Sequence, residues 1–438
     1  MKIKFLFFLG LLITLSFSPA LAQLESYRLD DTTGMFRDLC HIRNKYSNLS
    51  FTGYLQAQFQ YADSTGIPSY NGGDFSKYTN NRFMLRRARL RADYENLNES
   101  GFKKFYFALQ FDGTEKGVNI RDMFGRIYEN KLNYFVATVG MFNRPFGFEV
   151  NYSSASRETP ERGRMSQIIM NGERDLGSMI SFEPQDKNSK WYKLKVDAGF
   201  FNGQGLTGKA DFDKYKDFVS RISLRKTEIY NNLFLTGGVS YLNGGFRNGS
   251  RYNHTTMKND SGYFIMFADT SVSNIEKKAP RVYYGADIQL AYESGLGKTE
   301  IRAEYIFGTQ SATLHSSVTP GTPPLMSNSH PDSIYSRNFD GAYFYLLHTF
   351  KKKHQIVFKY DWYDPNVKIA GSSLLASNGF GNGDIRYDTF GCGYIFYYNN
   401  HLKVVLYYDH PMNEKSGMSG FSKDLQDDIF SCRVQFRF

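Results

Sequence analysis

The sequence predicts an all-β protein, a transmembrane antiparallel β-barrel of about sixteen strands. Apolar and polar residues alternate with a period of two along segments of about 9–11 residues, which is the length that a tilted membrane strand needs. The connections alternate as well, because tight turns such as 97–101 and 351–354 are followed by long loops rich in Gly, Ser and Asn. Tight turns at one end and long loops at the other are typical of membrane barrels.

The composition agrees with strands that have one apolar face and one face in contact with water. Of the 438 residues, 17% are aromatic, with 39 Phe and 32 Tyr, and only 12 are Pro. A soluble enzyme draws its apolar residues mostly from Leu, Val, Ile and Ala. A soluble β-sandwich or propeller is the alternative, but its strands would average about 5–6 residues.

The alternation is clearest in four segments, at 51–61, 102–112, 281–293 and 299–307. In FKKFYFALQFD, the second of these, Phe105 and Phe107 share one face of the expected strand. Tyr106 and Gln110 take the opposite face. The final segment, DDIFSCRVQFRF, ends on Phe438 with its aromatic residues in phase, which resembles the sorting signal of outer-membrane barrels. We therefore predict a location in the outer membrane of a Gram-negative bacterium.

The N-terminus predicts export. Residues 1–22 carry two early lysines, an apolar stretch, and a small-residue cleavage site framed by Ala20 and Ala22, as a secretory signal peptide does. An anchor helix is the alternative, but the apolar run is short for a bilayer span. Residues 23–49 are polar and irregular, so we predict a periplasmic extension there. The barrel is then expected to occupy residues 50–438.

The charge and the cysteines limit the classes of function. The formal net charge is +10, which suits an anionic solute, an anionic surface or nucleic acid. Export argues against a nucleic-acid partner. Cys40, Cys392 and Cys432 form neither a disulfide framework nor a metal-ligand pattern, and the histidines are scattered. We therefore predict no metal, no cofactor and no catalytic residue, so the protein is not expected to be an enzyme.

One strand carries an arginine column. In RFMLRRARLRADYEN, residues 82–96, the side chains of Arg87, Arg89 and Arg91 share one face. Each arginine facing lipid at mid-depth would cost about 2–4 kcal/mol, so this face must meet water inside the barrel. The column exceeds its two same-face acids, Asp93 and Glu95. An excess of cations along a water-filled pore lowers the energy barrier to the permeation of an anion.

The long loop at 143–177 is predicted to be functional. A structureless loop of this length inside a compact fold usually has a role. It holds a mixture of arginines and acids, and its Ile168, Ile169 and Met170 need cover from water. Folding the loop into the lumen would cover them and narrow the pore. A loose external loop is the alternative.

Several segments resemble one known family, the phosphate-selective porins of the outer membrane (the porin O and P family). The matching stretches lie within roughly residues 50–185, and the rest of the chain matches only in its strand rhythm. They are RRARLRADYE, IRDMFGRIYE, VGMFNRPFGFE and SSASRETPERGRM followed by NGERDLGSMISF.

The resemblance implies a trimeric sixteen-stranded barrel whose third extracellular loop folds inward as a constriction that binds the anion. By position it implies wall arginines at Arg87, Arg89 and Arg91, loop arginines at Arg157, Arg162 and Arg164, and a lysine cluster near the periplasm at Lys104, Lys193 and Lys195. Arg221 and Arg225, on the inward phase of their strand, complete the predicted pore-lining set. The many inward acids depart from the family pattern and put phosphate selectivity in doubt.

The sequence thus predicts a porin that passes small anions, phosphate or related oxyanions, by passive diffusion. Its expected partners are these anions, membrane lipid and lipopolysaccharide, and two further copies of itself in a homotrimer. Two alternatives stay open. One is a general porin without anion preference, and the other is an outer-membrane barrel that acts in adhesion or assembly.

Overall fold

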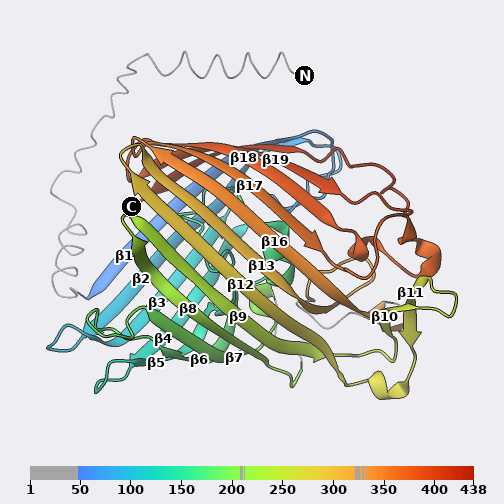
Figure 1. The fold of residues 1–438 in the computed structure, drawn as a ribbon, viewed down its shortest axis with the longest axis horizontal. Coiled ribbons are helices and arrows are strands. Elements are labelled where there is room, and N and C mark those ends of the chain that lie inside the picture. The colour runs from blue at the N-terminus through green and yellow to red at the C-terminus, as the bar shows by residue number, and fades with distance from the viewer. Residues whose placement is uncertain (1–47, 208–210, 212, 321–325, 328–329, 332) are drawn as a thin grey trace, which may run out of the picture. The chain divides into compact units, whose positions relative to one another are not determined.

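The computed structural model describes residues 48–438, except 208–210, 212, 321–325, 328–329 and 332 (Figure 1). The predicted signal peptide (1–22) and nearly all of the predicted extension (23–49) lie outside the described residues. The first strand begins at Leu49, one residue before the predicted start of the barrel.

Within the described part of the chain, sixteen antiparallel strands form a closed barrel, because the first strand pairs with both the second and the last (Figure 1). The predicted fold class is confirmed. The barrel strands are β1 (Leu49–Ala62), β2 (Asn81–Leu97), β3 (Lys103–Thr114), β4 (Gly117–Tyr128), β5 (Phe135–Asn143), β6 (Arg174–Phe182), β7 (Leu194–Phe201), β8 (Asp217–Tyr230), β9 (Leu233–Arg247), β12 (Lys278–Ser294), β13 (Gly297–Ala312), β16 (Ile334–Phe350), β17 (His354–Asp364), β18 (Tyr387–Tyr397), β19 (Leu402–Asn413) and β20 (Ile429–Arg437).

The connections hold the remaining elements. These are β10 (Asn253–Lys258), β11 (Phe264–Asp269), β14 (Met326–Ser327), β15 (His330–Pro331), the helix α3 (Arg164–Ile169) and 3-10 helices at Gly205–Thr207, Val272–Asn274, Gly371–Ser373, Ala376–Asn378 and Asn382–Asp384. The hairpin of β10 and β11 joins the sheet beside β16. Among the described residues, no helix is long and apolar enough to cross a membrane.

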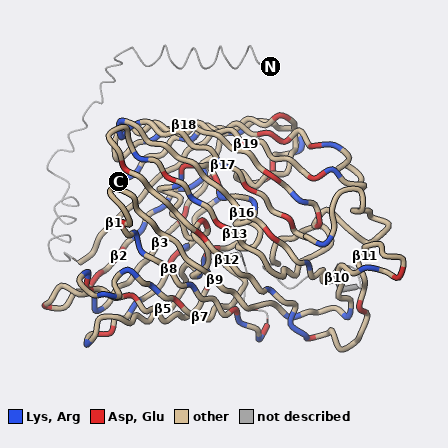
Figure 2. The backbone as a smooth tube through the Cα atoms, in the orientation of Figure 1, with Lys and Arg blue, Asp and Glu red and all other residues tan. Residues whose placement is uncertain are grey.

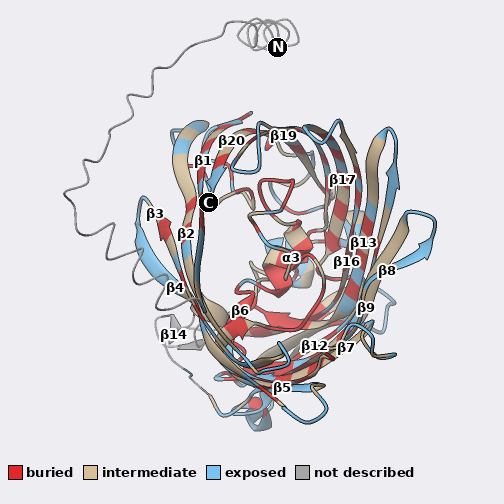
Figure 3. Ribbon diagram, turned by 90° about the vertical axis from the view of Figure 1, so that its left-hand side faces the viewer, coloured by how far each residue is buried: buried red, intermediate tan, exposed pale blue. Residues whose placement is uncertain are grey.

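The period-two pattern places apolar side chains outside and polar side chains inside. In β1, Gln56, Gln58 and Gln60 are buried on the inner face, while Leu55 and Tyr61 are exposed on the outer face. Figure 3 shows the same alternation of buried and exposed residues around the ring of strands. Residues of both charge signs lie close together along the strands in Figure 2. An apolar outer wall around a polar interior fits the predicted outer-membrane location.

The long loop lies between β5 and β6 and spans 144–173, slightly shorter than the predicted 143–177. Its helix α3 lies within the ring of strands in Figure 3. Ile168, Ile169 and Met170 are buried in one apolar cluster with inward-facing residues of the wall, such as Tyr283 and Phe339. The wall therefore gives these residues the cover that the sequence required.

Candidate functional site

Loop 144–173 contacts strands from separate parts of the wall. The hydroxyl groups of Ser154 and Tyr54, the latter on β1, lie 2.6 Å apart. On β13, the guanidinium of Arg302 pairs with Glu158 at 2.9 Å. Because β1 and β13 are not neighbours in the sheet, the loop spans the interior.

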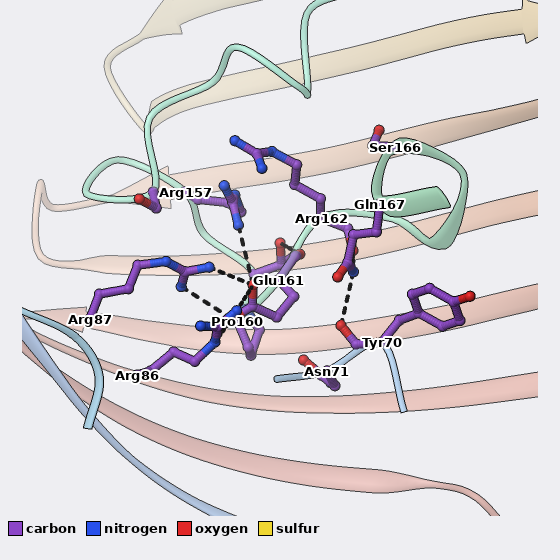
Figure 4. Close-up of polar contacts among 12 residues, drawn as sticks. Tyr70, Asn71, Arg86, Arg87, Arg157, Pro160, Glu161, Arg162, Ser166 and Gln167 are labelled. Carbon is purple, nitrogen blue, oxygen red and sulfur yellow. Dashed lines mark hydrogen bonds and ion pairs between the residues drawn. The ribbon is translucent and has the colours of Figure 1, made fainter. Parts of the chain in front are cut away.

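One carboxylate fastens the loop to the wall. Glu161 pairs with Arg87 at 2.6 Å, with Arg86 at 2.8 Å and with Arg433 at 3.0 Å, and the guanidinium of Arg157 lies 3.8 Å away (Figure 4). Burial opposes ionisation of Glu161, yet the surrounding guanidinium groups hold its pKa well below the usual range. The carboxylate therefore stays charged and ties the loop to β2 and β20.

The arginine column of β2 faces inward as predicted, but most of it is covered. Arg87 and Arg89 are buried, and Arg89 pairs with Asp112 of β3 at 2.9 Å. Only Arg91 keeps a quarter of its side chain (25%) exposed, and it pairs with Asp122 of β4 at 2.9 Å. The predicted excess of cations in this column is wrong, because acids from the loop and from neighbouring strands neutralise it.

The other predicted arginines of the wall are also paired. Arg221 on β8 pairs with Asp287 of β12 at 2.6 Å. Arg225 lies 3.8 Å and Lys195 3.7 Å from Glu183, which follows β6. These cations face the interior, and each has an acid partner.

The predicted lysine cluster does not form at 104, 193 and 195. The pairing of β2 with β3 shifts at its end, so Lys103 takes the inward position and pairs with Glu95 at 2.9 Å, whereas Lys104 is exposed. Lys193 is exposed in the turn before β7, where its carbonyl accepts a hydrogen bond from the Arg225 backbone N–H. Of the three, only Lys195 makes ion pairs inside the barrel.

A different set of lysines gathers at the short-turn end. Lys351, Lys352 and Lys353 form the turn between β16 and β17, all three are exposed, and none makes an ion pair within the described chain. They line a cavity of 980 Å³ together with Lys298, Lys403 and Arg437. The sequence predicts this turn as a short connection and shows its three successive lysines.

Arg162 lies between two cavities of the interior. It lines a cavity of 40 Å³ towards the long loops and also one of 380 Å³ that reaches Gly53 and Phe438 at the short-turn end. Its guanidinium lies 3.4 Å from Glu173. Burial, and then repulsion by Arg157, hold the pKa of Arg162 well below the usual range for arginine.

Asp427, in the long loop before β20, predicts a pH response. Its carboxyl group lines the small outer cavity. Burial raises its pKa to about 6, Arg164 opposes that rise, and Asp424 and Asp428 add to it. The carboxyl group is therefore charged at neutral pH and loses its charge as the pH falls through about 6.

We expect the ratio of anion to cation permeability to rise between about pH 7.5 and pH 5, because a negative charge beside this cavity is removed. The measurement is the reversal potential in a KCl gradient at both pH values. Asp427→Asn should reduce this step, and any part that remains would belong to the other carboxyl groups of this cavity, Asp361 and Asp409. If the reversal potential of Asp427→Asn changed with pH as much as that of the wild type, other groups, such as the histidines, would be responsible for the change.

The described residues contain no group of three or more His, Cys, Asp or Glu side chains placed to hold a metal ion. Cys392 and Cys432 are free thiols on β18 and β20.

No protein-family model and no curated protein matches this chain. Solved structures do. One is OprB of Pseudomonas putida, with a TM-score of 0.57 and 11% identity over 92% of this chain and 97% of that chain. Another is the outer-membrane channel DcaP of Acinetobacter baumannii, with a TM-score of 0.52 and 11% identity over 89% of this chain and 97% of that chain. A third is OmpT of Vibrio cholerae in its trimer form, with a TM-score of 0.50 and 10% identity over 89% of this chain and 99% of that chain. The chain has the fold of outer-membrane porins. At these identities the similarity concerns the fold alone, and the resemblance to phosphate-selective porins stays a prediction.

Proposed function

We propose that the chain is a passive outer-membrane porin for small anions, with loop 144–173 as its constriction. The proposal rests mainly on one observation, the cations of the interior that lack an acid at hydrogen-bond distance. They include Arg157 in the loop, Arg164 at the start of α3, and the lysines of the turn 351–353. They are spread over both ends of the passage.

Arg157 is the strongest of these features. Its side chain is 3% exposed, and none of its three guanidinium nitrogens has a hydrogen-bond partner in the described structure. Its one ion pair, with Glu161, is long at 3.8 Å. Buried polar groups are normally hydrogen-bonded, so these donors call for acceptors. An oxyanion supplies such acceptors in the geometry that a guanidinium favours.

The transport mechanism needs no covalent chemistry. An anion exchanges part of its water shell for guanidinium and ammonium donors, and several weak sites in series let it leave again. Phosphate and related oxyanions suit these donors best. We propose a homotrimer, which is supported by the trimer form of the OmpT structure, and outward contacts to membrane lipid and lipopolysaccharide.

A general porin without charge preference is the second candidate, because acids neutralise Arg87, Arg89 and Arg91. The reversal potential in a KCl gradient separates the two. An anion porin gives a potential of the sign expected for chloride permeation, and block by millimolar phosphate would show an oxyanion site. A potential near zero would identify a general porin.

Arg157→Gln is expected to lower the ratio of anion to cation permeability without lowering thermal stability. The substitution removes a buried charge whose donors have no partners, and such a charge contributes little to the fold. Arg87→Gln is the matched control. Arg87 is equally buried but donates to Glu161, so its replacement should lower stability. If Arg157→Gln instead left the permeability ratio unchanged, Arg157 would not be an anion site.

A further inference from the structure

We propose that the first long loop, residues 63–80, forms a second filter above the constriction loop, with Tyr70 and Arg164 as its specificity-determining residues. The filter would set the size limit through the ring of Tyr70 and the charge preference through Arg164. This inference rests on the proposed channel function, because it concerns which solutes the channel admits.

The tip of loop 63–80 is held inside the mouth of the barrel. Gln167 of α3 donates from Nε2 to the backbone carbonyl of Tyr70 at 2.9 Å (Figure 4). Asn71 donates from Nδ2 to the carboxylate of Asp409 on β19. Gln60 of β1 donates from Nε2 to the carbonyl of Asn71 at 2.8 Å. The tip is therefore attached to the constriction loop and to two strands of the wall.

The base of the same loop is packed rather than loose. Ile67 and Phe75 are buried in a small apolar cluster with Ala62 and Ile429. Arg82 of β2 donates to the carbonyl of Gly73 at 2.8 Å. A loop with its own core and anchored at its tip holds a defined position over the passage.

Arg164 lies between two aromatic rings at this position. Its guanidinium carbon is 3.5 Å from the centre of the Tyr387 ring and 4.6 Å from that of the Tyr70 ring. Each contact is a cation–π interaction. Among the described residues, Arg164 has no ion pair, unlike the arginines of β2. The rings thus hold the cation beside a cavity that Asp361 and Asp427 also line, and its guanidinium forms no ion pair with either carboxyl group.

The space beside this cation is small. The cavity that Tyr70, Asn71 and Arg164 line measures 40 Å³, against 380 Å³ and 980 Å³ for the cavities towards the short turns. A volume of about 10–15 Å³ holds one water molecule, so the outer cavity takes only a few. Tyr70 is one of the residues that bound this space, so its ring limits the size of a solute that can reach Arg164.

The test is single-channel recording on the full chain in planar bilayers, with chloride and then the larger anion gluconate. Tyr70→Ala is expected to raise conductance by about twofold and to raise the permeability of gluconate relative to chloride, because loss of the ring enlarges the cavity beside Arg164. Tyr70→Phe keeps the ring and should match the wild type. Tyr78→Ala is the matched control, because Tyr78 lies in the same loop and is 83% exposed.

The role of Arg164 in charge preference is tested with Arg164→Gln, which should lower the ratio of chloride to potassium permeability. Unchanged conductance and unchanged gluconate exclusion in Tyr70→Ala would overturn the filter, and an unchanged permeability ratio in Arg164→Gln would overturn the role of Arg164. Tyr70→Ser provides a second variant if Tyr70→Ala does not insert. Failure of the wild-type chain to form any channel would instead refute the proposed function.

Discussion

Replacing Glu161 with Gln is expected to release loop 144–173 from the wall and to lower the stability of the barrel. Glu161 is 6% exposed and holds Arg86, Arg87 and Arg433 at 3.0 Å or less. Removing one partner of a buried ion pair costs about 3–5 kcal/mol, because the remaining charge is left uncompensated. A neutral amide keeps the shape of the side chain but leaves these guanidinium groups facing one another.

Two readouts follow from this loss. The temperature at which the folded barrel unfolds in detergent should fall, and the single-channel current should become larger and noisier as the loop moves in the lumen. Glu99→Gln is the matched control, because Glu99 is exposed in the turn after β2. A variant Glu161→Gln with wild-type stability and a quiet current would show that apolar packing of α3, not the carboxylate, holds the loop.

The fold was predictable from the sequence because lipid imposes a simple rule. Each barrel strand meets lipid on one face and the interior on the other, so the apolar period of two continues from β1 to β20. Short turns lie at one end of the barrel and long loops at the other, so the connection that follows a strand indicates the direction of that strand. Neither signal depends on distant contacts, so a single sequence is enough to predict the number of strands.

The candidate site was harder to predict because its charges are balanced between elements far apart in the sequence. Asp93 and Glu95 are the acids on the same face of β2 as the three arginines, and alone they do not balance the positive charge. In the structure, Arg87 forms an ion pair with Glu161 of the loop, and Arg89 forms one with Asp112 of β3. No pattern within one strand reveals such a partner.

Local irregularities produced a second kind of error. A one-residue shift in the pairing of β2 with β3 turns Lys103 inward and leaves Lys104 exposed. Because the side-chain period is two, a shift of one residue exchanges the faces of a strand. The inward position of Tyr70 is likewise set by contacts to Gln167 that the sequence does not display.

The triple replacement of Lys351, Lys352 and Lys353 by Gln is expected to move the channel towards cation permeability more than any change in the arginine column. These lysines are exposed, have no acid partners in the described structure, and line the 980 Å³ cavity at the short-turn end. Their field therefore reaches a permeating ion without local cancellation.

A rough size follows from Coulomb's law. At about 10 Å in water, one unit charge changes the energy of a passing ion by about 0.4 kcal/mol, so three contribute about 1.2 kcal/mol, which changes the permeability of one ion by somewhat under tenfold. Salt screens this effect, because the Debye length falls from about 10 Å at 0.1 M to about 3 Å at 1 M. The shift in reversal potential should therefore be large in dilute KCl and small in concentrated KCl.

The matched control is Lys187, Lys190 and Lys193, all replaced by Gln. These lysines are also exposed and lie in the connection between β6 and β7 at the same end of the barrel, but they do not line the 980 Å³ cavity. Equal shifts in the two triple variants would mean that the total charge of this end, rather than the turn 351–353, sets the preference. No shift in either would show that neither group of lysines sets the preference.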